Sequence, residues 1–387
     1  MMSKNLMIGS IAATIALMPF AANAATGVES DSIVFGQAAA LDGPAAALGT
    51  GMRTGLMAAF EEANRDGGVH GRSLKLLSYD DGYEPDRSIT QVRKLIEEDG
   101  VFSLIGAVGT PTSKATQPIA TDASVPFIGP FTGAGFLRDA SHGNIINVRA
   151  TYAAETEAWI KHLVDEQGLE NIAILYQDDA FGRVGLDGVQ AALEKRSMSL
   201  VAQGTYERNT LAVKSALLDI RKAKPDAVVM VGAYKPIAEF IKLSRKVKFN
   251  PTFVNISFVG SKALANELGE DGEGVIVSQV VPFPWDSSMP LVRAYQEALK
   301  AVDPNAEPGF VTLEGYMVGR LAIEALEAAG RDVTREAFLS AFSNQGSFDL
   351  GGVTLNFGAS DNQGMDDVFM TVIQKDGSFK PLGGSAS

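Results

Sequence analysis

Two loops in the first third of the chain carry residues whose types suit the binding of an anion. The apolar run 101–105 ends at Gly106 and Gly109, and Thr110 then stands directly before Pro111. A threonine followed by proline is typical of the N-cap and first turn of a helix. The free N–H groups of a helix N-terminus attract negative charge, so a carboxylate is the expected guest of this loop.

A second loop of the same kind follows the apolar run 125–128. That run stops at Pro130, and the loop at 131–135 reads FTGAG. Its small residues leave backbone amides and a hydroxyl uncovered, and neighbouring parallel strands would bring the two loops side by side. Such turns occur in every wound α/β sheet and most of them hold no ligand, so the loops alone do not establish a site.

Four aromatic residues stand just past predicted strands, where open α/β sheets bind their ligands. They are Tyr152, Phe181, Tyr234 and Phe258. Any one of them taken alone is more often a core residue than a ligand contact. Their recurrence at equivalent places along the chain favours an aromatic cleft between two lobes.

Motifs of enzymes are absent from the sequence. It has no G-x-S-x-G elbow, no Walker A phosphate loop, no Ser-x-x-Lys and no His-Glu-x-x-His. The histidines, His70, His142 and His162, are scattered and do not have the spacing of metal ligands. We therefore predict a protein that is not an enzyme, with no catalytic residues, no metal and no cofactor.

Strands and helices alternate from Ser32 onward, which predicts mostly parallel sheets covered on both faces. The alternation restarts after the strand at 145–148, as expected for a second lobe. We predict an α/β fold of two doubly wound parallel-sheet lobes joined by hinge crossovers near 149–151 and 280–284. The predicted first lobe comprises residues 31–149 plus 283–347, and the second comprises residues 150–282 plus 348–387.

Length and composition agree with a two-domain exported protein. The chain has 387 residues, 46% of them hydrophobic. Residues 1–24 carry one lysine, an apolar run and the sequence Ala22-Asn23-Ala24, the pattern of a signal peptide cleaved near Ala24. Later apolar runs are shorter than the roughly 18 to 20 residues that span a bilayer. A periplasmic location is expected, without disulfides because there is no cysteine.

The charge of the chain bears on its partners. Its formal net charge is −13, and an acidic surface repels phosphate groups. Nucleic acid and anionic membranes are therefore not expected as partners.

The order of motifs along the chain resembles the type I periplasmic solute-binding proteins of ABC importers, in the branched-chain amino acid-binding, leucine-binding protein-like branch. The resemblance runs from about Ile33 to the end. The segments that carry it are LDGPAAALG, ANRDGGVHGRSLKL, YDDGYEPDRS, IGAVGTPTS, VPFIGPFTG, NVRATYAAE, LYQDDAFGRVGLDGV, VGAYKP, VSQVVPFP, PGFVTLEGY and GGVTLNF. Each of these segments is a weak signal alone, but together and in this order they are specific.

The resemblance assigns ligand-binding roles to residues of both lobes. It implies that Thr110, Phe131, Thr132 and Gly133 hold the ligand carboxylate, the same groups that the two anion-binding loops contain. It further implies that Leu48 lines the side-chain pocket and that Tyr152 lies at the hinge edge of the cleft. The aromatic positions that the resemblance places over the ligand are Phe181, Tyr234 and Phe310.

The sequence departs from the family pattern where the acidic residue for a ligand ammonium group should fall, near Ser257 or Phe258. No aspartate or glutamate occurs between Phe253 and Gly260. Asp178 and Asp179 are the candidate substitutes. The disulfide of the family is also missing.

These features lead to one main function hypothesis. We expect an extracytoplasmic binding protein, a monomer, that delivers a small amino acid-like or carboxylate solute to an ABC permease and ATPase complex. The ligand is left open among branched-chain amino acids, other amino acids or amides, and aromatic or aliphatic acids. The alternatives are a ligand-sensing subunit for a membrane receptor and, with less support, an extracytoplasmic enzyme.

Overall fold

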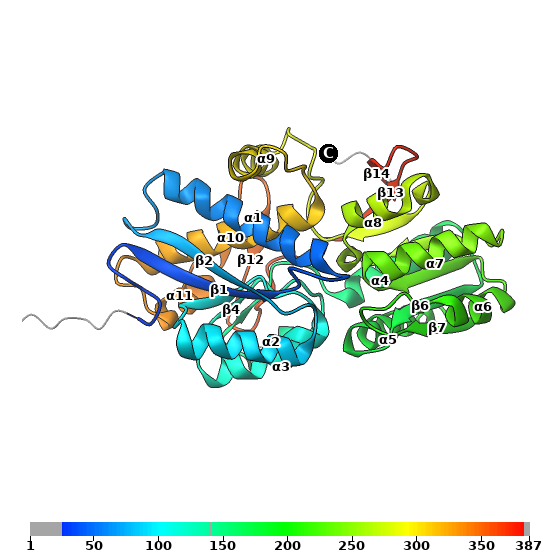
Figure 1. The fold of residues 1–387 in the computed structure, drawn as a ribbon, viewed down its shortest axis with the longest axis horizontal. Coiled ribbons are helices and arrows are strands. Elements are labelled where there is room, and N and C mark those ends of the chain that lie inside the picture. The colour runs from blue at the N-terminus through cyan, green and yellow to red at the C-terminus, as the bar shows by residue number, and fades with distance from the viewer. Residues whose placement is uncertain (1–24, 140, 383–387) are drawn as a thin grey trace, which may run out of the picture.

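A computed structural model describes residues 25–139 and 141–382 as two lobes, each built on its own sheet (Figure 1). The predicted signal peptide at 1–24 lies outside the described residues. Within the described ranges no helix is long and apolar enough to cross a bilayer.

The sheet of the first lobe has five parallel strands in the order β2-β1-β3-β4-β5. They are β1 (Ser32–Ala39), β2 (Ser73–Asp80), β3 (Ser103–Ile105), β4 (Phe127–Ile128) and β5 (Ile145–Ile146). Strand β1 is buried along almost its whole length, as expected for a parallel strand covered on both faces.

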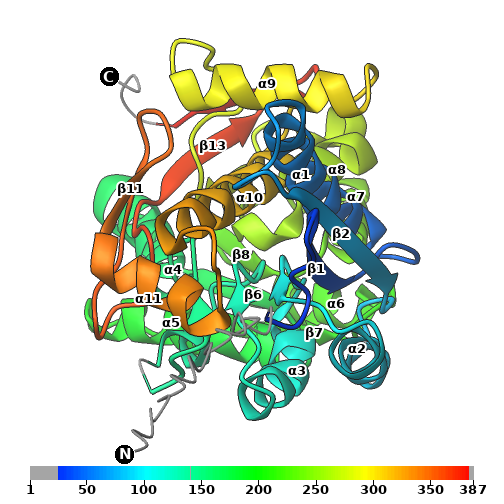
Figure 2. The same ribbon diagram turned by 90° about the vertical axis from the view of Figure 1, so that its left-hand side faces the viewer.

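Helices cover both faces of this sheet. Helices α1 (Ala46–Arg65) and α10 (Phe310–Ala329) pack together on one face, and α2 (Pro85–Arg93) and α3 (Thr110–Asp122) lie on the other (Figure 2). Helix α1 buries Leu48, Met52, Leu56 and Phe60, which recur every four residues and form one apolar stripe. Helices α9 (Pro290–Val302) and α11 (Arg335–Gln345) complete the lobe.

The sheet of the second lobe has seven strands in the order β14-β13-β10-β9-β8-β6-β7. They are β6 (Ile172–Gln177), β7 (Ala202–Tyr206), β8 (Ala227–Val231), β9 (Thr252–Asn255), β10 (Ile276–Gln279), β13 (Phe369–Ile373) and β14 (Phe379–Pro381). The last two strands are antiparallel additions at one edge. The helices of this lobe are α4 (Tyr152–Ile160), α5 (Ala180–Glu194), α6 (Lys214–Lys222), α7 (Tyr234–Lys246) and α8 (Ser261–Leu268).

The predicted fold class, two lobes with mostly parallel sheets, is confirmed. The apolar runs expected as strands at 101–105, 125–128 and 145–148 contain β3, β4 and β5, because buried parallel strands are short apolar runs between glycine and proline turns. The sequence pattern did not predict α8 or strands β11 (Ser347–Asp349) and β14. These elements are short, and β11 alternates exposed and buried residues over only three positions.

Three chain segments connect the lobes, whereas the sequence predicted two, near 149–151 and 280–284. The first passes through 147–151, the second through 280–284, and the third through the residues before β13. The first and third run side by side, since the amide of Gly364 donates to the carbonyl of Asn147 at 2.8 Å. Such paired hinge segments allow two lobes to rotate without unfolding either.

The predicted return to the second lobe at residue 348 differs from this arrangement. The hairpin of β11 and β12 (Thr354–Asn356) packs on the first lobe, where the ring of Phe348 lies 5.6 Å from that of Phe342 in α11. The chain crosses later, just before β13 at Phe369. The apolar residues of the hairpin could pack against the core of either lobe. The sequence pattern therefore could not assign the hairpin to one lobe.

Candidate functional site

The two predicted anion-binding loops meet through their threonines. Oγ1 of Thr110 lies 2.6 Å from Oγ1 of Thr132, and both side chains are fully buried. The loops follow adjacent strands, β3 and β4, so their hydroxyls arrive at the same edge of the first-lobe sheet. This is the side-by-side placement that the sequence predicted.

Thr110 is not the N-cap of α3, contrary to the prediction. The cap is Gly109, which has φ of 102° and is followed by Thr110 as the first helical residue. A side chain at residue 109 would be strained at this φ, and its Cβ would lie 2.2 Å from Cε2 of Tyr83. Because Gly109 takes the cap position, the hydroxyl of Thr110 is free to point toward Thr132.

Gly133 allows the second loop to touch the start of α4. The carbonyl of Gly133 accepts the amide of Tyr152 at 2.8 Å. A Cβ at residue 133 would lie 2.7 Å from both the amide nitrogen and Cδ1 of Tyr152. Glycine is therefore required by close packing between the first-lobe loop and a second-lobe helix.

Aromatic rings from both lobes pack into one cluster beside the threonines, the cleft cluster of Tyr83, Phe131, Tyr152, Phe181 and Phe258. Ring centroids lie 5.2 Å apart for Phe131 and Phe258, 4.7 Å for Phe181 and Phe258, and 5.4 Å for Tyr152 and Phe181. Tyr83 lies 5.9 Å from Phe258 and was not identified from the sequence. It sits in the turn after β2, at φ of 61°, and follows no apolar strand pattern of its own.

Leu48 and Tyr234 join the lobes at another place. The amide of Ala47 donates to the hydroxyl of Tyr234 over a long 3.4 Å. Leu48, fully buried on α1, packs against Gly260 before α8, where a Cβ would lie 2.5 Å from Cδ2 of Leu48. Both predicted residues therefore lie where the first lobe faces the second.

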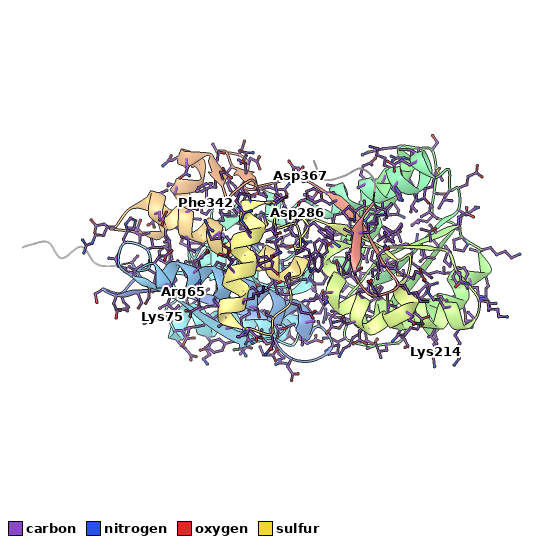
Figure 3. All side chains as sticks on the ribbon, turned by 90° about the horizontal axis from the view of Figure 1, so that it is seen from above. Arg65, Lys75, Lys214, Asp286, Phe342 and Asp367 are labelled. Atoms are coloured by element: carbon purple, nitrogen blue, oxygen red, sulfur yellow. The ribbon has the colours of Figure 1, made fainter. Side chains whose placement is uncertain are left out.

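Phe310 lies in a different aromatic cluster. Its ring centroid is 6.0 Å from that of Phe283 and 5.6 Å from those of Trp285 and Phe379. Phe283 and Phe310 line a hollow of about 720 Å³ along the hinge segments. The acids Asp286 and Asp367 line the same hollow and lie between the lobes in Figure 3. The structure does not bring Phe310 to the cleft cluster.

A glutamate from α4 occupies the place at Ser257 where the sequence had no acid. Oε2 of Glu155 accepts the amide of Ser257 at 2.9 Å, and Oε1 accepts the Ser257 hydroxyl at 2.9 Å. The hydroxyl of Ser278 also donates to Oε2. Glu155 is fully buried, and it is about one hundred positions before Ser257, so local sequence reasoning could not place the two together.

Arg149 is a buried cation between these groups. Its Nη2 donates to the hydroxyl of Ser257, and its Nε lies 3.4 Å from Oε1 of Glu314 without forming a hydrogen bond to it. The guanidinium carbon lies 4.7 Å from the ring centroid of Phe131, a cation–π contact. Its position in the first hinge segment was visible in the sequence, but its inward orientation was not.

The buried charges shift the pKa values of their neighbours. Burial lowers the pKa of Arg149, but Glu314, Tyr152 and Glu155 outweigh this effect, so the pKa lies above its ordinary value. Burial raises the pKa of Glu314 to about 7, with Glu155 adding to the rise while Arg149 and Arg138 oppose it.

Several buried donors in this region have no hydrogen-bond partner. They are Nε and Nη1 of Arg149, the hydroxyl of Tyr152 and the hydroxyl of Ser113 on α3. Buried polar groups in native proteins are almost always paired. Oxygen atoms of a bound ligand are acceptors that would satisfy such donors.

The two acids considered as substitutes already have partners. Asp178 pairs with Arg183 at 2.8 Å, and its side chain is 53% exposed. Asp179 accepts the amide of Phe181 at 2.9 Å as the cap of α5 and pairs with Arg208 at 3.0 Å. No group of three metal-ligating side chains occurs among the residues that the structure describes.

Comparison with known proteins agrees with this architecture. A family model described as periplasmic binding protein matches residues 32–378. The solved structure of a possible leucine/isoleucine/valine-binding protein from Rhodopirellula baltica SH 1 is 38% identical, with a TM-score of 0.87 over 93% of this chain and 98% of that one. An extracellular ligand-binding receptor from Verminephrobacter eiseniae is 28% identical, with a TM-score of 0.83 over 90% of this chain and 99% of that one.

A sequence relative, the Leu/Ile/Val/Thr-binding protein of Salmonella typhimurium, is 24% identical over 80% of this chain and 82% of its own length. The matched family consists of periplasmic solute-binding proteins that work with ABC transporter permeases, not of enzymes. The resemblance inferred from the sequence motifs is confirmed: the chain belongs to the periplasmic binding protein family, in the type I group that includes the leucine-binding proteins.

Proposed function

We propose that this protein captures a small carboxylate or amino acid-like solute between its lobes and delivers it to an ABC importer. The observation that carries the proposal is the buried pair of Thr110 and Thr132, enclosed by aromatic rings from both lobes. Hydroxyl and amide donors grip a carboxylate, and the cleft cluster suits an apolar side group. The relatives that bind leucine, isoleucine and valine support the same class of solute.

Capture and closure are separate steps. The ligand carboxylate binds first to the loops of the first lobe, at Thr110 and at 131–133. The second lobe then rotates about the hinge segments and adds Phe181, Phe258 and Tyr234. Only contacts made in the closed form can drive this rotation, because a ligand shifts an equilibrium by its difference in affinity for the two states. The second-lobe aromatics therefore act mainly on the closure equilibrium.

The proposal also includes the export of the chain, its oligomeric state and the residues that contact the ligand. A signal peptide cleaved near Ala24 would export the chain, and the mature protein would act as a monomer that docks on the permease of its importer. Thr110, Phe131, Thr132, Gly133, Tyr152, Phe181, Ser257 and Phe258 would surround the ligand, and Leu48 and Tyr234 would close one side. The bound solute would leave chemically unchanged.

A thermal-shift screen of the mature protein tests the proposal. Carboxylates and amino acids at millimolar concentration should include at least one that raises the melting temperature, because a ligand of the native state stabilises it by mass action. Mass spectrometry of the solute after incubation should recover it intact. A screen without any stabilising carboxylate or amino acid, or the appearance of a product, would contradict the proposal.

A further inference from the structure

We infer that the ligand is a carboxylic acid without an α-ammonium group, and that Arg149 is the residue that selects for it. The inference rests on the proposed function, because it concerns the same cleft between the lobes. It follows from three observations on the charges of that cleft.

The first observation is that no carboxylate on the surrounding segments is left without a partner. An ammonium group buried in a protein requires an acceptor, and preferably a carboxylate. Six acids lie on the segments that carry the cleft cluster and Arg149's partners, and each is hydrogen-bonded or ion-paired: Asp81 to Tyr83 and Ser88, Glu84 to Arg208 and Asn209, Glu155 to Ser257 and Ser278, Asp178 to Arg183, Asp179 to Arg208, and Glu314 to Arg149.

The second observation is that Glu155 and Arg149 already meet at Ser257. The guanidinium of Arg149 donates to the Ser257 hydroxyl and is stacked on Phe131. Its Nη2 also lies 3.9 Å from Oε1 of Glu155, the acid that is bonded to Ser257, so an ammonium group at this position would have to compete with Arg149 for that acid. Two like charges in a buried site repel each other strongly, since little water screens them. A zwitterionic amino acid would place its ammonium group against this cation.

The third observation is the set of unpaired donors. Nη1 of Arg149, the Tyr152 hydroxyl and the Ser113 hydroxyl are buried and have no hydrogen-bond partner, and Nε of Arg149 has only its 3.4 Å ion-pair contact with Glu314. A buried donor without an acceptor is unfavourable, whereas a charge-assisted bond to a carboxylate is among the stronger hydrogen bonds. Ligand oxygens are the groups that satisfy such a set. An acid with a flat apolar or aromatic body, with or without a 2-oxo group, fits both these donors and the rings of the cleft cluster.

Matched ligand pairs on the mature wild-type protein test the inference directly. Calorimetry would compare leucine with 4-methyl-2-oxopentanoate, and phenylalanine with phenylpyruvate and 3-phenylpropanoate. Within each set the carbon skeleton is constant and the α-substituent changes. We expect at least one acid to bind more tightly than its amino partner by about 100-fold or more, the ratio expected when an unpaired buried charge is avoided.

The outcomes separate this inference from the proposed function. Equal or tighter binding of the amino acids would overturn the inference and leave the proposed function standing. Binding of none of the five compounds, together with no stabilising carboxylate or amino acid in the wider screen, would remove the proposed function and the inference with it.

A variant pair tests the role of Arg149 itself. Arg149→Lys keeps the charge but loses the planar fork of donors, so the preference for the acid over its amino partner should fall by about tenfold or more. Arg320→Lys is the control, because Arg320 pairs with Glu62 and Glu324 near the opposite end of α1 from Leu48. An unchanged ratio in a folded Arg149→Lys protein would refute the assignment. If this variant does not fold, the wild-type ligand pairs still decide the ligand class.

Discussion

Nη2 of Arg208 in the second lobe lies 2.7 Å from Oε2 of Glu84 in the first lobe, which makes this ion pair a direct link between the lobes. The neighbouring Asn209 donates to Oε1 of the same Glu84 at 2.7 Å and to the carbonyl of Gly82 at 3.0 Å. These bonds involve no ligand, so they stabilise this arrangement of the two lobes by themselves. They lie next to Tyr83, whose ring belongs to the cleft cluster.

Arg208→Gln should weaken ligand binding by shifting the lobes toward an open form. The pair is partly exposed, so we expect a loss of about 1 kcal/mol, roughly fivefold in affinity. Calorimetry would measure the affinity, and small-angle scattering of the ligand-free protein should show a larger radius of gyration. Arg183→Gln is the matched control, because Arg183 pairs with Asp178 inside one lobe. Equal effects of the two substitutions would contradict the inference that the Arg208–Glu84 pair holds the two lobes together.

Thr110→Val should weaken carboxylate binding without unfolding the protein. Valine has nearly the same shape as threonine, but it removes a buried hydroxyl that lies 2.6 Å from Thr132. We expect a loss of about 1 to 3 kcal/mol in binding free energy. Thr116→Val on the same helix is the control, since its buried hydroxyl bonds only the Thr112 carbonyl within the helix. Calorimetry that finds equal affinity for Thr110→Val and wild type would remove Thr110 from the site.

Gly133→Ala tests the close approach between the lobes. The added methyl group would lie 2.7 Å from the amide and ring of Tyr152, so the first-lobe loop and α4 must separate. We expect a cost of about 1 to 3 kcal/mol, measured as weaker binding and a lower melting temperature. Gly135→Ala in the same loop has open space around its Cβ and should behave like wild type. A fully stable Gly133→Ala protein with normal affinity would be inconsistent with this packing.

The sequence predicted those parts of the site that depend on the local pattern of strands and loops. Thr110 and Thr132 follow apolar strands, and parallel strands that are neighbours must bring their loops together. The pairing of Glu155 with Ser257 and of Arg149 with Glu314 could not be predicted this way, because each pair joins residues more than one hundred positions apart through the hinge. Phe310 was expected over the ligand from its motif alone, whereas the structure places its ring beside Phe283 and Trp285 at the start of α10.

Ionisation of Glu314 should lower the free energy of unfolding as the pH rises. Its pKa in the folded state is about 7, whereas an ordinary glutamate has a pKa of 4.5. Between these two values the folded state holds a proton that the unfolded state has lost, so raising the pH favours unfolding. The full effect, present above about pH 7, is on the order of 3 kcal/mol. Asp81, with a pKa raised to about 6 by burial, acts in the same direction.

Glu314→Gln isolates the contribution of this group. Other carboxylates titrate in both proteins, so the quantity to follow is the free energy of unfolding of the variant minus that of wild type, from urea titrations between pH 4.5 and 8. We expect this difference to increase as pH rises. In wild type the buried Glu314 ionises beside Glu155 and the protein loses stability, whereas glutamine cannot ionise. Glu336→Gln serves as the control. The pKa of Glu336 is lowered by hydrogen bonds at the start of α11, so its difference should run the other way. A Glu314→Gln difference that stays flat across this range would mean that Arg149 and Arg138 hold Glu314 ionised in the folded protein.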